Sequence, residues 1–446
     1  MQLEKYNIPV PRYTSYPTVP MWNQDQFSVD GYKQTLQTSF WENSKEVSIY
    51  VHLPFCESLC TYCACNTRIT RNHSVEEPYL RRVLKEWQLY LQEFPTRPVI
   101  REIHLGGGTP TFFAPENLQM LILGLFEGAE KSPNIQMSFE GHPANTKATH
   151  LQALYDVGFD RLSLGIQDFD ANVQKLINRK QTYEQVKEVM EAAREIGYTS
   201  INHDVIYGLP GQTLATLNRT LDQVVGLSPD RIAYYSYAHV PKVKPTQKVY
   251  EAFLPSPEEK FEFKQFGKKR LVTEGYQEVG MDHFVKPTDE LIKAQERGDL
   301  NRNFMGYTTD SSGLLIGLGV SAISDTWTGF IQNEKVVENY SQMIDQGQLP
   351  VVRGHLLTKE DLFFRKHILN LMCHFTTRWS ITEIMHHGIS INFELLYQLE
   401  EDGVIALEET GIRVLPDGRE MIRIVCSALD ARLNETNRSV LFSQAV

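Results

Sequence analysis

Strand-like runs alternate with amphipathic helical patterns from about residue 47 to residue 285 of this 446-residue chain, and this alternation limits the fold more than any other feature. Six runs are predicted as buried strands, at residues 47–53, 101–105, 135–140, 161–165, 200–207 and 231–238. The segments between them have helical period; residues 75–94, opened by a capping box of Ser74 and Glu77, and residues 184–196 are clear examples. Repeated β–α units predict a parallel sheet, and right-handed crossovers favour curling it into a full or partial barrel.

Charge and hydropathy exclude several classes of protein. The chain carries 44 basic and 55 acidic residues, a formal net charge of −11. This balance argues against non-specific binding to nucleic acid or to an anionic membrane surface. Apolar runs are short and broken by glycine, and the first 30 residues lack the apolar stretch of a secretory signal. We therefore expect a cytoplasmic protein that does not insert into a membrane.

Helical patterns dominate after about residue 285. The clearest lie at residues 360–374, 391–402 and 418–433. Residues 381–416, with two short helices and a hairpin around residues 408–411, resemble a winged-helix unit. Acidic residues outnumber basic ones after residue 354, so a lid or docking domain is favoured over a DNA-reading domain.

The cysteines are strongly clustered. Four of the six fall within ten residues, directly after the first predicted strand: Cys56, Cys60, Cys63 and Cys65. The other two, Cys373 and Cys426, lie in apolar runs and are predicted as buried core residues. Thiolates spaced C-x3-C-x2-C can bind three irons of a cubane cluster and leave the fourth iron open, unlike the ferredoxin spacing or paired zinc hooks.

Polar residues and glycines also follow the predicted strands. Glu140, Gln167 and Asp204 end or follow three successive strands, at the edge where a β/α barrel carries its chemistry. Any one of them could be a solvated strand end, but three in register favour a site. The stretch His104-Leu-Gly-Gly-Gly-Thr-Pro110 follows the second strand and is either a tight turn or bare backbone that a ligand can approach.

The cysteine spacing at the end of the first strand of a β/α array resembles the radical S-adenosylmethionine (SAM) superfamily. That resemblance implies a [4Fe–4S] cluster on the three cysteines, with SAM chelating the fourth iron. An electron from the reduced cluster would then cleave SAM into methionine and a 5′-deoxyadenosyl radical. The glycine stretch matches the segment that contacts SAM in this superfamily.

Longer segments are similar to the oxygen-independent coproporphyrinogen III oxidases, also called dehydrogenases. They lie at residues 11–17, 161–168, 204–210, 237–239, 280–284, 302–309 and 319–324. The resemblance implies an α/β fold with a partial (β/α)6 TIM-like radical SAM barrel and extra strands. It divides the chain into an N-terminal arm covering the barrel mouth (1–45), the barrel with its Fe–S loop (46–285), a linker completing the SAM and substrate site (286–350), and a mainly helical, winged-helix-like C-terminal domain (351–446).

The resemblance also implies roles for individual residues. Cluster ligation falls on Cys56, Cys60 and Cys63. Contacts to a first SAM fall on Tyr50, Gly108, Thr109, Glu140 and Arg179. A second SAM matches Gly107, Gln167, Asp204, Ala238 and Ile323, with Tyr62 nearby, although the division between the two molecules is left open. Cys65 is assigned an active-site role without iron ligation, and Tyr62 is placed with it. His142 departs from the family pattern and either lines the SAM site or fills a turn, of which the turn is preferred.

The implied reaction converts two propionates of coproporphyrinogen III into vinyl groups, giving protoporphyrinogen IX in haem biosynthesis. The radical removes a β-hydrogen from propionate, CO2 leaves, and the remaining electron passes to an unidentified acceptor. A flavodoxin-type protein is an expected electron donor, and a monomer is expected. The substrate carries four carboxylates, so Arg12, Tyr13, Tyr16 and Arg302 are candidate contacts; a packed N-terminal arm is the alternative for each.

Two other functions fit the same scaffold. One is a haem-binding or trafficking protein that has a cluster but does not turn over porphyrinogen. The other is a radical SAM enzyme that acts on haem. Cys65 and the segment at residues 11–17 favour the oxidase over the trafficking protein.

Overall fold

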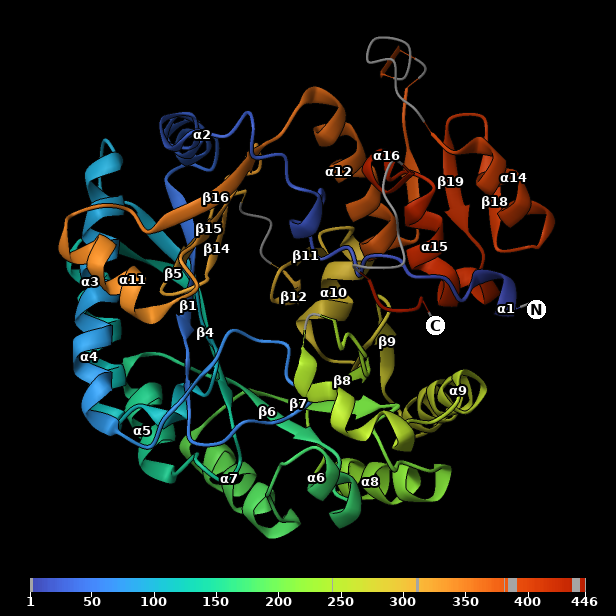
Figure 1. The fold of residues 1–446 in the computed structure, drawn as a ribbon, viewed down its shortest axis with the longest axis horizontal. Helices are drawn as coiled ribbons and strands as arrows, with labels where there is room; N and C mark the ends of the chain where they lie inside the picture. The colour runs from blue at the N-terminus through green and yellow to red at the C-terminus, as the bar shows by residue number, and fades with distance from the viewer. Residues whose placement is uncertain are drawn as a thin grey trace.

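A 12-stranded sheet with the strand order β16-β15-β14-β13-β1-β4-β5-β6-β7-β8-β10-β9 runs through the molecule (Figure 1). The structure is a computed structural model that describes residues 3–242, 244–309, 313–380, 382–383, 391–434 and 442–445. Seven neighbouring strands are parallel: β13 (Leu315–Leu318), β1 (Glu46–Leu53), β4 (Val99–Gly107), β5 (Glu130–Gly141), β6 (Arg161–Gln167), β7 (Ser200–Tyr207) and β8 (Arg231–Ser236). All six predicted strands are therefore confirmed.

Helices cover the outer face of the curved sheet (Figure 1). They are α3 (Glu76–Glu93), α4 (Pro115–Glu127), α5 (Ala148–Val157), α6 (Ala171–Leu176), α7 (Tyr183–Ile196), α8 (Leu214–Gly226) and α9 (Pro257–Thr273). The apolar sides of the parallel strands and of most of these helices pack into one large core, whereas Val173 of α6 belongs to a separate small cluster. The predicted capping box of Ser74 and Glu77 is wrong, because the chain forms the 3-10 turn η2 (His73–Val75) there and α3 begins only at Glu76.

The sheet is open, and its two ends are antiparallel. One end carries β10 (His283–Val285) and β9 (Gln277–Val279); the other carries β14 (Ile323–Asp325), β15 (Gly329–Asn333) and β16 (Val351–Leu356). Within the described residues, no strand pairing joins β9 to β16. The predicted α/β fold, a partial barrel with extra strands, is confirmed.

Strands continue beyond residue 285, where the sequence pattern weakens. β13 lies beside β1, with Tyr50 opposite Gly317, although 267 positions separate them in the sequence. The segment also holds α10 (Glu290–Arg297), the hairpin of β11 (Asn301–Asn303) and β12 (Gly306–Thr308), and α11 (Val337–Asp345). These strands are only three to five residues long, too short to show a clear period. The boundaries of the predicted linker stay a prediction.

The C-terminal part builds a second, smaller unit. Its elements are α12 (Lys359–His374), β17 (Thr376–Arg378), α14 (Phe393–Glu401), β18 (Ile405–Glu408), β19 (Gly411–Val414), η5 (Pro416–Met421), α15 (Ile422–Ser427) and α16 (Ala431–Asn434). The helices predicted at 360–374 and 391–402 and the hairpin are confirmed. The single helix predicted at 418–433 is wrong, since this stretch breaks into η5, α15 and α16. Most of the first winged-helix helix, predicted from residue 381, lies outside the described residues.

The N-terminal arm packs against this unit. After α1 (Leu3–Tyr6), an extended segment pairs with the chain's other end through an isolated bridge between Pro9 and Gln444. We call the shared hydrophobic cluster the arm core; it joins Tyr6, Val10, Tyr13 and Tyr16 to apolar residues between 363 and 433. The arm continues through η1 (Val19–Met21) and α2 (Val29–Glu42). No helix in the described part of the chain is long and apolar enough to cross a membrane.

Candidate active site

The cysteine loop begins where β1 ends. The short strand β2 (Phe55–Cys56) pairs with β3 (Arg68–Ile69) and holds the two ends of the loop together. A turn brings Cys63 N to 3.1 Å from Cys60 O, and Thr61 N donates to Ile177 O at 3.0 Å. Cys56, Cys60 and Cys63 are half-buried, whereas Cys65 is exposed. The loop therefore presents its thiols at the carboxyl end of the parallel strands.

These thiols line one cavity of about 250 Å³, which we call the thiol cavity. Twelve of the predicted site residues line it: Cys56, Cys60, Cys63, Cys65, Tyr62, Gly107, Gly108, Thr109, Glu140, Gln167, Arg179 and Asp204. They come from the ends of β1, β4, β5, β6 and β7 and from the loop after α6. Strand ends that are adjacent in a parallel sheet meet at one edge, so the register of the sheet assembles the site.

The glycine stretch forms the cavity wall beside the cysteine loop. Gly107 has a φ of +108°, and a Cβ there would lie 2.6 Å from the His52 ring. A Cβ at Gly108 would lie 2.7 Å from Pro54 O. Only glycine fits at either position, so a ligand can approach the bare backbone. Thr109 follows, with its hydroxyl 3.3 Å from Cys56 Sγ.

Glu140 presents its carboxylate to the cavity from the end of β5. Gly107 N donates to Glu140 Oε2 at 3.2 Å, and His104 Nε2 lies 3.5 Å from Oε1. The side chain is still 45% exposed, so the carboxylate keeps capacity for a ligand. Tyr50 stacks on His104 with ring centroids 6.0 Å apart, and its hydroxyl lies 3.0 Å from His52 Nδ1. Tyr50 thus adjoins the Glu140 side of the cavity without lining it.

Arg179 connects the cavity to the cysteine loop. Its Nη1 donates to Cys60 Sγ at 3.6 Å and to Tyr62 OH at 3.3 Å. Its Nη2 donates to Gly165 O, and its Nε donates to Gln181 Oε1 at 2.9 Å. Although Arg179 is only 6% exposed, its hydrogen-bond partners in the described part of the chain include no carboxylate. The guanidinium is therefore suited to an anionic group in the cavity.

Gln167 and Asp204 carry signs of functional strain. Gln167 adopts a φ of +65°, unusual for a residue with a Cβ, and its buried Oε1 has no hydrogen-bond partner among the described residues. Burial, followed by the nearby Glu140 charge, raises the pKa of Asp204 to about 7. Asn202 Nδ2 at 2.8 Å and Ser163 Oγ at 3.3 Å only partly offset this.

Three further predicted positions lie near the cavity. Gln247 Nε2 is 3.3 Å from both Ala238 O and Tyr62 O, so Ala238 adjoins the cysteine loop. Ile323 is the first residue of β14, and its backbone lies against Gly317, which pairs with Tyr50 in the sheet. Neither residue lines the cavity. His142 lines the thiol cavity. Its Nδ1 also accepts a hydrogen bond from Ala144 N at 3.1 Å, so it has the predicted turn role as well.

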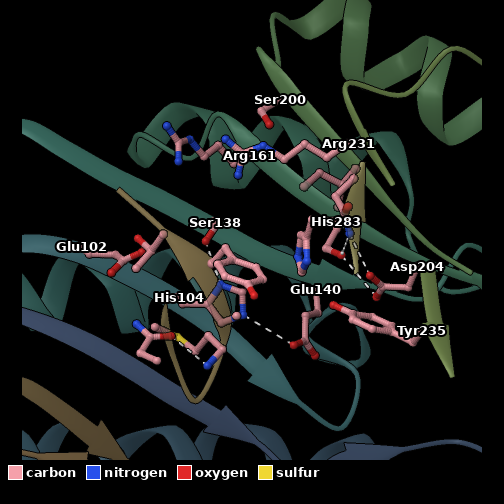
Figure 2. A pocket seen from close by; sticks show the side chains of 18 residues that line it. Glu102, His104, Ser138, Glu140, Arg161, Ser200, Asp204, Arg231, Tyr235 and His283 are labelled. Atoms are coloured by element: carbon pink, nitrogen blue, oxygen red, sulfur yellow. Dashed lines mark hydrogen bonds and ion pairs between the residues drawn. The ribbon is translucent and has the colours of Figure 1, made fainter. Parts of the chain in front are cut away.

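A second cavity of about 160 Å³ lies inside the barrel and shares Glu140, Ser163 and Asp204 with the first. Figure 2 shows polar side chains from neighbouring strands converging on this space, among them His104, Ser138, Tyr235 and His283. Barrels of this type usually fill their interior with aliphatic side chains. A polar, partly hollow interior therefore indicates space for a polar ligand or water.

Arg12 and Arg302 meet on one carboxylate beside this interior. Arg12 Nη2 lies 3.3 Å from Asp282 Oδ2, and Arg302 Nη1 lies 3.8 Å from Oδ1. The Arg302 side chain is 4% exposed, and its Nε has no hydrogen-bond partner among the described residues. Arg12 also lies over the ring of Tyr235, which lines the interior cavity. Two cations thus share one anion near the barrel mouth.

A family model described as the radical SAM superfamily matches residues 50–224. The oxygen-independent coproporphyrinogen III oxidase of Pseudomonas aeruginosa is 38% identical, over 98% of this chain and 96% of the relative. Its namesake from Escherichia coli is 38% identical over 100% of this chain and 97% of the relative. The solved structure of the E. coli coproporphyrinogen III oxidase, described as a radical SAM enzyme, has a TM-score of 0.87 at 36% identity and covers 95% of this chain and 99% of that chain.

The chain belongs to the oxygen-independent coproporphyrinogen III oxidase family. This oxidase family is part of the radical SAM superfamily, which implies a [4Fe–4S] cluster and SAM. The thiol cavity fits both groups, because the thiols of Cys56, Cys60 and Cys63 line it together with Gly107 and Gly108, whose backbone carries no side chain. No three His, Cys, Asp or Glu side chains in the described residues are already arranged to hold a metal ion. The assignment of iron ligands stays a prediction.

Tyr13 and Tyr16 do not reach either cavity of this oxidase-family chain. Each is 3% exposed and packed in the arm core. Tyr13 OH donates to Asp430 Oδ2 at 3.1 Å, and Tyr16 packs against Phe364 with ring centroids 6.0 Å apart. Their placement supports the packed-arm interpretation, and we drop both as substrate contacts.

Sequence reasoning missed several residues around the site of this oxidase-family member. His52, His104, Ser163 and Asn202 all hydrogen-bond to predicted site residues or to each other. His52, Ser163 and Asn202 each lie on the same strand as a predicted residue, an even number of positions away, so the strand period of two places both on one face. His104 is three positions from Gly107 on β4 and does not follow this pattern. That period is the signal that could have identified the other three.

Proposed function

We propose that this chain catalyses the oxygen-independent oxidative decarboxylation of coproporphyrinogen III to protoporphyrinogen IX. The observation that carries the proposal is the thiol cavity, where three cysteines, a glycine wall, a carboxylate and a buried guanidinium meet. The names of the full-length relatives support the same substrate. None of these relatives is named as a haem-trafficking protein or a haem-modifying enzyme.

The bound groups supply chemistry that side chains lack: the cluster delivers one electron, and SAM yields a 5′-deoxyadenosyl radical. Cys56, Cys60 and Cys63 would hold the cluster as thiolates. Glu140 would accept the SAM ammonium, and Arg179 would bind its carboxylate, because each faces the cavity with unused capacity for an opposite charge. Gly107 and Gly108 let the backbone approach the methionyl chain.

We extend the proposal to two SAM molecules bound side by side. Gln167 and Asp204, assigned to the second molecule, line the same cavity as Glu140 and Arg179. The unpaired Gln167 Oε1 and the raised pKa of Asp204 support this assignment, since a bound cation or hydroxyl would relieve both. Ala238 and Ile323 would border the second molecule.

The substrate carries four carboxylates, and the chain has a net charge of −11, so local cationic side chains must bind the carboxylates. Arg12 and Arg302 are the remaining candidates, because together they carry one more positive charge than Asp282 neutralises. A propionate that approached this pair would find donors already oriented. Cys65 is exposed at the end of the cysteine loop, where it would contact the reacting propionate without ligating iron.

The deciding experiment is anaerobic reconstitution with iron and sulfide, reduction, and incubation of coproporphyrinogen III with SAM. Chromatography should show protoporphyrinogen IX and loss of two CO2 per substrate. Retention of haem without protoporphyrinogen or CO2 would instead support the trafficking alternative. A haem-derived product would support a radical SAM enzyme acting on haem.

A further inference from the structure

A surface groove of about 500 Å³ opens beside the cysteine loop. It is built from α6, the turn that follows it and the start of α7. Its lining includes Gln174, Lys175, Asn178, Arg179 and Lys180. This groove is separate from the thiol cavity except for one shared residue, Arg179.

That shared residue forms a short connection between solvent and the predicted iron ligands. The Arg179 guanidinium faces the thiol cavity and donates to Cys60 Sγ at 3.6 Å. The groove also touches the cysteine loop directly, because Asn178 Nδ2 donates to Leu59 O at 2.7 Å. Thr61 N donates to Ile177 O at 3.0 Å from the same turn. One side chain therefore separates the groove from a predicted ligand of the cluster.

The groove is positively charged although the chain is acidic. Residues 171–182 include Lys175, Arg179 and Lys180 and no acidic residue, whereas the net charge of the chain is −11. Lys175 and Lys180 are exposed, and neither forms an ion pair within the described residues. A local patch of the opposite sign to the whole protein is a feature that can steer and orient a charged partner.

Exposed apolar side chains lie next to the groove and the cysteine loop. The 3-10 segment η4 (Pro245–Phe253) packs on the cysteine loop, with Tyr250 OH donating to Thr61 O at 3.1 Å. Val249 is 81% exposed, Phe253 56% and Leu59 37%. Phe253 O accepts from Gly211 N at 2.7 Å, and a Cβ on Gly211 would meet Leu176 of α6, so η4 and the groove are neighbours. Exposed apolar residues beside lysines are typical of transient protein interfaces.

We infer that this surface docks a small acidic electron-carrier protein, which passes one electron to the cluster. The inference rests on the proposed function, since it needs the cluster on Cys56, Cys60 and Cys63. The carrier is oxidised by one electron and the cluster is reduced by one; no bond forms and no proton moves. Acidic surface on the carrier pairs with Lys175 and Lys180, and its apolar residues cover Val249, Phe253 and Leu59.

The test compares two reductants on the reconstituted holoenzyme. The variant is K175E/K180E, and the matched control is K359E/K366E on α12, which makes the same change in net charge far from α6 (Figure 1). Reduction is followed as bleaching of cluster absorbance after mixing with a reduced flavodoxin or with photoreduced 5-deazariboflavin, a small uncharged donor. Bleaching reports the cluster without requiring substrate turnover, so this readout is independent of the product assay.

At low ionic strength, K175E/K180E should slow reduction by flavodoxin roughly tenfold or more, because charge steering is lost. Added salt should slow the wild type but hardly affect the variant. The deazaflavin rate should be the same in wild type, variant and control. The inference is overturned if flavodoxin reduces the variant at the wild-type rate, if K359E/K366E slows it equally, or if the deazaflavin rate falls in parallel. The last result would mean a damaged cluster or a groove that serves a small ligand.

Discussion

The thiol cavity and the arm core both bury polar groups, but they differ in how fully those groups are paired with other protein groups. In the thiol cavity, Gln167 is strained and its Oε1 unpartnered, and burial raises the pKa of Asp204 to about 7. In the arm core, Arg423 donates to backbone carbonyls of both chain ends, including Pro11 O at 2.9 Å and Gln444 O at 2.8 Å. Tyr13 is bonded to Asp430. The arm core also has costs, because Tyr13 has a φ of +48° and burial raises the pKa of Asp430 to about 6. These arm-core groups are nevertheless bonded to protein partners, whereas Gln167 Oε1 in the thiol cavity is left with binding capacity.

The comparison predicts the largest effect for the thiols themselves. Cys60→Ser should abolish both the cluster absorbance and SAM cleavage, because a cubane needs all three thiolates. Cys65→Ser should keep the absorbance, since Cys65 is exposed and not assigned as a ligand. Cys373→Ser, at a fully buried core position, is the control and should change stability but not iron content. Loss of iron in Cys65→Ser would disprove the three-ligand assignment.

The sequence allowed prediction of the thiol cavity far better than of the arm core. The six parallel strands have a clear apolar pattern, and most site residues lie on them or in the loops that directly follow them. The arm core depends on contacts between residues 6–16 and residues 363–433, which no local period reveals. The pairing of β13 with β1 and the contact of Arg12 with Asp282 are similarly distant in sequence. Such contacts are set by the tertiary fold, so pattern analysis named Tyr13 and Tyr16 without showing where they lie.

A substitution in the arm core should act on stability alone. Phe364 is fully buried and packs against Phe363 and Tyr16. Phe364→Ala should lower the free energy of unfolding by about 3–5 kcal/mol, through lost burial and the cavity left behind. Urea denaturation measures the loss, and iron per folded protein should stay unchanged. Phe393→Ala, at a position 44% exposed, should change stability by less than about 0.5 kcal/mol.

A substitution in the thiol cavity should do the reverse and stabilise the ligand-free protein. The pKa of Asp204 is raised from 3.8 to about 7, so the folded state binds a proton more tightly than the unfolded state. The cost of its buried charge is therefore full above pH 7 and absent below about pH 4. Asp204→Asn should raise the free energy of unfolding by about 1–2 kcal/mol at pH 8, and this gain should vanish as pH falls to about 4. Thermal unfolding across this pH range measures it; a gain independent of pH would exclude titration of Asp204 as its cause.

The smallest expected effect separates a packed arm from an arm that binds substrate. Tyr13→Phe removes the hydroxyl that donates to Asp430 Oδ2 at 3.1 Å and leaves the buried ring in place. The free energy of unfolding should fall by about 1 kcal/mol, the usual net value of one such hydrogen bond. The KM for coproporphyrinogen III should not change, because the hydroxyl is bonded to Asp430 inside the arm core.

Arg12→Met is the contrasting variant for this measurement. Arg12 comes from the same arm one position earlier, but its guanidinium lies on Tyr235 and Asp282 and is 32% exposed. Its loss should raise KM with little change in kcat, since it removes a carboxylate contact made equally in ground and transition states. If Tyr13→Phe raised KM as much as Arg12→Met, the whole arm would have to move into the substrate site. The N-terminal arm would then have two packing arrangements, one in the arm core and one in the substrate site. The difference between the thiol cavity and the arm core would in that case hold only for the substrate-free protein.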